Sequence, residues 1–133
     1  MHKGYKQLVA EANAVIETIP AVEAVERLRE GEVVFIDLRE GPELQRDGMI
    51  PGAVHAPRGM LEFYADPASP YHQTVFDSSL PKLLYCASGA RSALAAQRLQ
   101  EMGLTSIAHL GGGLKAWKDA GGPVSVQTAL VGA

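Results

Sequence analysis

One segment of the chain places a possible nucleophile beside groups that would activate it. Cys86 is the single cysteine in the 133-residue sequence, and it follows the apolar run 83–85. The small residues at 87–90 come next, and then Arg91 begins a stretch with helical spacing. This pattern predicts a strand, a tight loop and the N-terminus of a helix. The thiol is therefore expected where the strand ends.

A cysteine at the start of a helix is suited to nucleophilic chemistry. Unpaired backbone N–H groups there carry a partial positive charge, which stabilises a thiolate and also attracts a bound anion. Such surroundings lower the pKa of a cysteine from about 8.5 to roughly 3.5–7.5, and a shift of ~2 units corresponds to about 2.7 kcal/mol. We predict that Cys86 is the catalytic residue. A buried structural thiol is the alternative for a lone cysteine.

Two further arginines follow predicted strands. Asp37 and Arg39 come directly after the apolar run 33–36, and a pair at this position is more often a packed ion pair than a catalytic one. We therefore predict structural support from both. Arg58 follows a short predicted strand and is a candidate to face the same edge of the sheet and bind substrate; a solvated surface arginine is the alternative.

Hydrophobic spacing predicts alternating helices and strands along the whole chain. Helices are expected at 4–17, 20–31 and 42–46, then from Arg91 to about Gly103, and around Trp117. Strands are expected at 33–36, within 49–57, at 83–85 and at 107–110. Residues 58–81 are the least regular part and form either a lid or a packed surface excursion.

This alternation predicts a single α/β domain over residues 1–133. Its sheet is expected to be mainly parallel, with helices on both sides. Residues 1–18 are predicted to form a helical extension and residues 19–124 the core. Ligands bind beyond the carboxyl ends of the strands in this architecture, and Cys86 lies at such an end.

Composition limits the setting and the partners. The composition is that of an ordinary soluble domain, with 47% hydrophobic and 20% charged residues. The net charge of −3 argues against a nucleic acid or an anionic membrane as partner, because either would favour a basic face. A lone cysteine permits no internal disulfide, and the N-terminus resembles neither a signal peptide nor a membrane span, so a cytoplasmic location is expected. No cofactor is predicted. The spacing of three histidines also predicts no metal site: His55, His72 and His109.

Four motifs in order resemble the rhodanese homology domain in its single-domain form. They are Asp37-x-Arg39-Glu40, Gly48-x-Ile50-Pro51-Gly52-Ala53, Cys86-x-x-Gly89-x-Arg91-Ser92, and Gly112-Gly113 with Trp117 nearby. The resemblance covers roughly residues 19–124 and implies sulfurtransferase chemistry. Cys86 would attack the outer sulfur of thiosulfate or a similar small anionic donor, release sulfite and become a persulfide. A thiol, cyanide or a partner protein would then accept the sulfur.

The resemblance assigns substrate-binding roles to the loop after the cysteine: Ala87, Ser88, Gly89, Ala90, Arg91 and Ser92. Its backbone N–H groups would stabilise the thiolate and then the persulfide. Arg91 either braces the loop or holds the donor's anionic group, and Gly89 permits a positive φ. The Ser88 hydroxyl either reaches a bound anion or satisfies the loop, whereas Ser92 is expected to help start the helix.

Loop length separates this expectation from the related dual-specificity phosphatases. Four residues lie between Cys86 and Arg91, whereas those phosphatases use five, which form a wider cradle for phosphate. No acidic residue lies in the loop and no second cysteine exists, which disfavours phosphatase and arsenate reductase activity.

Thiosulfate-using relatives often carry a loop cation, but Ala87 and Ala90 are neutral. A persulfide, polysulfide or protein donor therefore stays open. A sulfur-carrier or interaction module with low turnover also stays open, as does the choice between monomer and homodimer.

Overall fold

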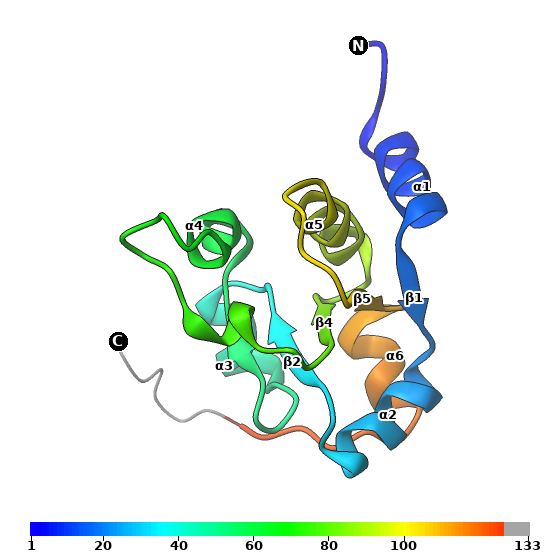
Figure 1. Cartoon of the computed structure of the whole chain (residues 1–133). Coiled ribbons are helices and arrows are strands. Elements are labelled where there is room, and N and C mark those ends of the chain that lie inside the picture. The colour runs from blue at the N-terminus through cyan, green and yellow to red at the C-terminus, as the bar shows by residue number, and fades with distance from the viewer. Residues whose placement is uncertain (127–133) are drawn as a thin grey trace.

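A computed structural model describes residues 1–126, in which five parallel strands form one sheet (Figure 1). The strands are β1 (Glu17–Ile19), β2 (Val34–Asp37), β3 (Val54–His55), β4 (Lys82–Tyr85) and β5 (Ile107–Leu110). They lie in the order β1-β5-β4-β2-β3. Strand β4, which leads to Cys86, is therefore central. The predicted α/β class with a parallel sheet is confirmed.

Helices cover both faces of this sheet (Figure 1). Along one face lie α1 (Tyr5–Val15), α4 (Leu61–Ala65) and α5 (Ala90–Glu101). Along the other lie α2 (Ala21–Glu30), α3 (Gly41–Asp47) and α6 (Gly113–Asp119). The irregular segment 58–81 also contains two 3-10 helices, η1 (Arg58–Met60) and η2 (Thr74–Asp77). Among residues 1–126, no helix has the length and hydrophobicity needed to cross a membrane.

The apolar strands pack against helices on both sides. Phe35 and Leu83 belong to the core beneath α2 and α6, where the Trp117 ring meets Phe35 edge-on at 5.4 Å between centroids. The next residues along the strands, Ile36 and Leu84, belong to the core beneath α4 and α5. Successive strand side chains point to opposite faces, so a continuous apolar run is typical of a sheet buried on both sides.

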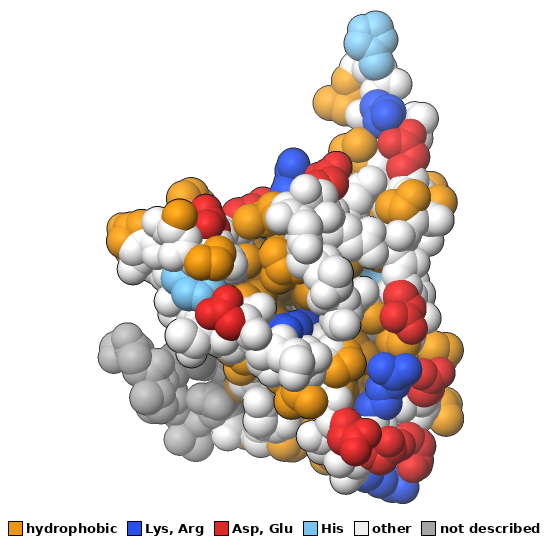
Figure 2. Space-filling model, viewed as in Figure 1, with side chains coloured by type: hydrophobic (Ala, Val, Ile, Leu, Met, Phe, Trp, Pro, Cys, Tyr) orange, Lys and Arg blue, Asp and Glu red, His pale blue; other side chains and the backbone are white. Residues whose placement is uncertain are grey.

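Helix α2 shows how local sequence defines a surface element. It begins after Pro20 and ends at Gly31, whose φ of 72° lies in the left-handed region. Arg27 on its outer surface pairs with Glu23 one turn earlier at 2.8 Å. Figure 2 shows acidic and basic side chains gathered over this helix. The solvent face of α2 is therefore charged while its inner face packs on the core.

The prediction for the N-terminus was wrong in one respect. The helix expected over 4–17 ends at Val15, and residues 17–19 form the edge strand β1, paired with β5. Ile19 fits a helical spacing from α1, but it is 2% exposed because it lies in the sheet. Three residues are too few to show an alternating pattern. Their pairing partner lies about 90 residues further along the chain, so a local pattern gives no sign of it.

Candidate active site

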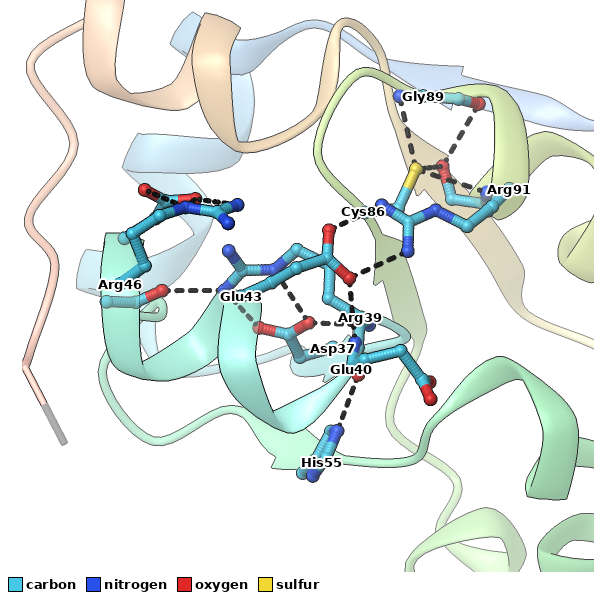
Figure 3. A network of polar contacts seen from close by, with 12 residues as sticks. Asp37, Arg39, Glu40, Glu43, Arg46, His55, Cys86, Gly89 and Arg91 are labelled. Carbon is cyan, nitrogen blue, oxygen red and sulfur yellow. Dashed lines mark hydrogen bonds and ion pairs between the residues drawn. The ribbon is translucent and has the colours of Figure 1, made fainter. Parts of the chain in front are cut away.

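The sulfur of Cys86 lies inside the loop that joins β4 to α5 (Figure 3). The N–H of Gly89 donates to Sγ at 3.2 Å, and the N–H of Ser92 donates at 3.4 Å. The Ser92 Oγ lies 3.6 Å from the same sulfur. Cys86 is 1% exposed. The buried sulfur therefore accepts two backbone hydrogen bonds where α5 begins.

The start of α6 fixes the loop from behind. The N–H of Leu114 donates to the Cys86 carbonyl at 2.9 Å, and the N–H of Lys115 donates to the Ala87 carbonyl at 3.3 Å. A trans peptide places its C=O and N–H on opposite sides, so the N–H groups of these two peptides point away from α6. Gly113 makes the approach possible, because a Cβ there would lie 2.5 Å from the Ala87 carbonyl.

The small residues of the loop lie beside two open depressions. Gly89 has a φ of 106° and precedes α5. Together with Ser88 and Ala90 it lines a depression of about 350 Å³ next to α1. Ala87 lines another depression of about 240 Å³, to which Lys118 also contributes. The loop therefore borders open space in two places.

Arg91 forms a two-point ion pair with Glu43 of α3 (Figure 3). Its two terminal nitrogens donate to the carboxylate at 2.9 and 2.8 Å. The Arg91 guanidinium lowers the pKa of Glu43 from 4.5 to about 2, and Glu43 in turn raises the pKa of Arg91. Arg91 was predicted either to brace the loop or to hold the donor's anionic group. Its ion pair with Glu43 is the contact that a brace requires.

Glu43 itself was missed at the level of sequence. Its carboxylate also accepts a hydrogen bond from the N–H of Glu40 at 2.9 Å and completes a capping box at the start of α3. An acidic residue three positions after a helix-capping residue is the signal that was available. The capping box orients Glu43 toward Arg91.

Asp37 and Arg39 form a buried ion pair where β2 ends. The Arg39 Nε donates to Oδ1 at 3.0 Å and Nη2 donates to Oδ2 at 2.8 Å. Burial opposes the charge on Arg39, but the hydrogen-bonded Asp37 raises its pKa. Nη2 also donates to the Gly48 carbonyl at 2.6 Å, and His55 bonds to the Arg39 carbonyl at 2.6 Å. This pair therefore joins β2, α3 and β3, which is a structural task.

Arg58 lies on η1 with its guanidinium occupied. It donates to Glu62 at 2.8 Å, and its side chain is 30% exposed. Arg98 approaches the same carboxylate at 3.7 Å. The structure thus places Arg58 in a surface ion-pair group on the α4 side of the molecule.

The contact between Ser92 and His109 is a part of the site that the sequence did not reveal. The Ser92 hydroxyl, expected to help start α5, lies 2.9 Å from Nδ1 of His109 and 3.2 Å from the Gly89 carbonyl. His109 is 3% exposed on β5, and burial lowers its pKa. A polar residue within the apolar strand 107–110 was the available signal. The sequence analysis considered His109 as a metal ligand, and that question does not bear on its contact with Ser92.

Comparison with known proteins agrees with this geometry. The Rhodanese-like domain family matches residues 20–120. A protein named "Sulfurtransferase" from Allochromatium vinosum is 29% identical over 111 residues, covering 83% of this chain and 95% of that protein. The chain spans 41% and 53% of the length of two longer relatives.

Two solved structures show how far the likeness extends. One from Rhodopseudomonas palustris, described as a protein of unknown function and possible tyrosine phosphatase, is 46% identical with a TM-score of 0.91. The match covers 94% of this chain and 96% of that chain. The polysulfide-sulfur transferase homodimer from Wolinella succinogenes is 27% identical with a TM-score of 0.70, covering 96% and 90% of the two chains.

Proposed function

We propose that this chain, which belongs to the rhodanese-like family, transfers sulfane sulfur through a persulfide on Cys86. A relative that is named a sulfurtransferase supports this activity. The observation that carries this proposal is the set of donors around Sγ. The N–H groups of Gly89 and Ser92 point at the sulfur of a buried cysteine at a helix N-terminus. That arrangement stabilises a thiolate, which is the nucleophilic form.

The proposed reaction has two displacement steps at sulfur. The Cys86 thiolate attacks the outer sulfur of the donor, the donor's S–S bond breaks, and its electron pair leaves with sulfite or a shortened sulfide chain. The loop N–H groups then stabilise the Cys86 persulfide anion. An acceptor thiolate or cyanide attacks the outer sulfur of the persulfide, and the electron pair of that S–S bond restores the Cys86 thiolate.

We propose an anionic polysulfide or persulfide as the preferred donor, with thiosulfate as a poorer one. Ala87 and Ala90 supply no charge for a sulfonate group, and Arg91 is engaged by Glu43. The similarity to a protein named as a polysulfide-sulfur transferase supports the same choice.

Intact-mass measurement tests the proposal directly. Incubation with polysulfide is expected to add one sulfur atom to the wild-type protein, and an acceptor thiol is expected to remove it. Cys86→Ser is expected to add none while retaining its fold, because the side chains are nearly equal in size. A reactive wild-type thiol that gains no sulfur from polysulfide, thiosulfate or a persulfidated protein would refute sulfur transfer.

A phosphatase is the second candidate, because a protein 46% identical to this chain is described as a possible tyrosine phosphatase. The four-residue spacing between Cys86 and Arg91 and the absence of an acidic residue within the loop weigh against it. Hydrolysis of an aryl phosphate that depends on Cys86 would favour it. Rapid loading from a persulfidated partner protein, with little turnover of small donors, would instead favour a sulfur-carrier module.

A further inference from the structure

A continuous chain of hydrogen bonds leads from Cys86 to side chains of α1 and β1. Sγ lies 3.6 Å from the Ser92 Oγ, which lies 2.9 Å from Nδ1 of His109. The other ring nitrogen, Nε2, lies 3.2 Å from Oδ1 of Asn13 on α1 and 3.1 Å from Oγ1 of Thr18 on β1. Cys86, Ser92 and His109 are each at most 3% exposed.

The acceptors in this chain fix the direction of its protons. Asn13 Oδ1 accepts a hydrogen bond but cannot donate one, so it favours the tautomer with hydrogen on Nε2 and a free lone pair on Nδ1. The Ser92 hydroxyl carries one proton, for which the Gly89 carbonyl at 3.2 Å and Nδ1 of His109 at 2.9 Å are alternative acceptors. When the hydroxyl donates to Nδ1, which is the shorter contact, its oxygen accepts from the Cys86 thiol.

The same chain also satisfies the charged state. When the thiol proton moves to Ser92 and the hydroxyl proton moves to His109, Nδ1–H donates to Oγ and Oγ–H donates to the thiolate. Each donor keeps an acceptor, and the thiol and imidazole become thiolate and imidazolium with the proton count unchanged. No heavy atom has to change its partner.

The outer end of the chain reaches an open surface. Asn13, Thr18 and His109 line the depression of about 350 Å³ beside α1, together with the loop residues 88–90. Burial lowers the pKa of His109, so its imidazole is neutral while the thiol keeps its proton, and the imidazolium forms only where the thiolate lies beside it. The charged groups of the elements packed around it are exposed or bonded elsewhere: Lys6 and Glu11 on α1, Glu17 on β1, Lys82 on β4, and Arg91, Arg98 and Glu101 on α5. Cys86 is thus the titratable partner of His109.

We propose that His109 is a positioning residue that accepts the Cys86 proton through Ser92, so that the buried thiol ionises beside an imidazolium. This inference rests on the proposed role of Cys86 as a nucleophile, but it concerns formation of the thiolate rather than transfer of sulfur.

The test compares the pH dependence of Cys86 alkylation by iodoacetamide in His109→Asn and the wild-type protein. Asparagine can still bond to Ser92 but cannot accept a proton at neutral pH. The profile of the variant is expected to move upward by about one pH unit, which is about a tenfold lower rate at a fixed pH below both midpoints. Ser92→Ala, which removes the link at similar volume, is expected to give the same shift.

Combining the two substitutions shows whether they act through one chain. The double variant is expected to show no shift beyond that of either single variant, whereas independent effects would add. His72→Asn is the matched control, because His72 is hydrogen-bonded to Asp77 in the excursion 58–81; its profile is expected to equal that of the wild type. Circular dichroism and thermal melting verify that each variant is folded.

Each result supports or overturns the inference. A folded His109→Asn or Ser92→Ala with the wild-type alkylation profile overturns it, even if sulfur transfer is intact. Should His109→Asn not fold, His109→Gln takes its place, because Ser92→Ala also removes the hydroxyl that donates to the thiolate and cannot decide alone. A shifted profile in a protein that never carries sulfur supports the inference while refuting the proposed function.

Discussion

The carboxylate of Glu43 and the guanidinium of Arg91 meet across 48 residues of sequence, with N–O distances of 2.8 and 2.9 Å. One residue lies on α3 and the other in the first turn of α5. The pair joins the element that follows β2 to the loop that holds Cys86. It therefore stabilises the shape of the loop.

Replacing Glu43 by Gln tests this contact through stability. The folded protein lowers the pKa of Glu43 from 4.5 to about 2, so the ion pair contributes stability above about pH 4.5 that is lost as the pH falls through about 2. Glu43→Gln is expected to be about 1 kcal/mol less stable at pH 7, since the exposed Arg91 side chain is screened by water. Urea unfolding at several pH values measures the difference, which should vanish at the acidic end. A difference that does not change with pH would contradict the assignment.

Gly113→Ala tests the packing of α6 against the loop. The added Cβ would lie 2.5 Å from the Ala87 carbonyl and 2.7 Å from the Cys86 carbonyl. We expect sulfur loading to fall at least ~10-fold. Gly52→Ala is the matched control, with a φ of 77° but no atom within 4 Å of its Cβ, so it should lose roughly 1–2 kcal/mol of stability and little activity. Equal loading rates in the two variants would show that α6 does not shape the loop.

Asp37→Asn tests the buried ion pair. The substitution leaves the Arg39 guanidinium, which is 1% exposed, without its counter-ion. The expected loss is about 3–5 kcal/mol, measured by chemical denaturation. The exposed pair of Arg46 and Asp47 supplies the control, because solvent screens that contact and Asp47→Asn should leave the midpoint of unfolding nearly unchanged. Comparable losses in the two variants would mean that burial does not strengthen this contact.

Arg58→Ala tests whether the arginine on η1 contributes to donor binding. Since Glu62 already neutralises its guanidinium at 2.8 Å, the KM for polysulfide or thiosulfate is expected to change by less than about twofold. Arg91→Ala, which removes the brace on the loop, is expected to reduce the rate of sulfur loading. A tenfold rise in KM for Arg58→Ala would instead assign this residue to the donor site.

Local sequence determined the elements that carry strong local signals. The apolar runs became β2, β4 and β5, the glycine after Glu30 ended α2, and the position of Cys86 between strand and helix predicted its place at the carboxyl end of the sheet. These features depend on side-chain periodicity, on backbone conformation and on the amide groups of a helix start. Each operates within a few residues, so each is readable from the chain alone.

Tertiary structure decided the contacts between distant segments. The sequence gives no sign that Glu43 faces Arg91, that Thr18 pairs with His109, or that Gly113 packs against the peptide after Cys86. Their separations range from about 27 to 91 residues, and their spatial proximity follows from the order of the strands in the sheet. The local sequence predicts a nucleophile, and the packing of the parallel strands determines which groups surround it.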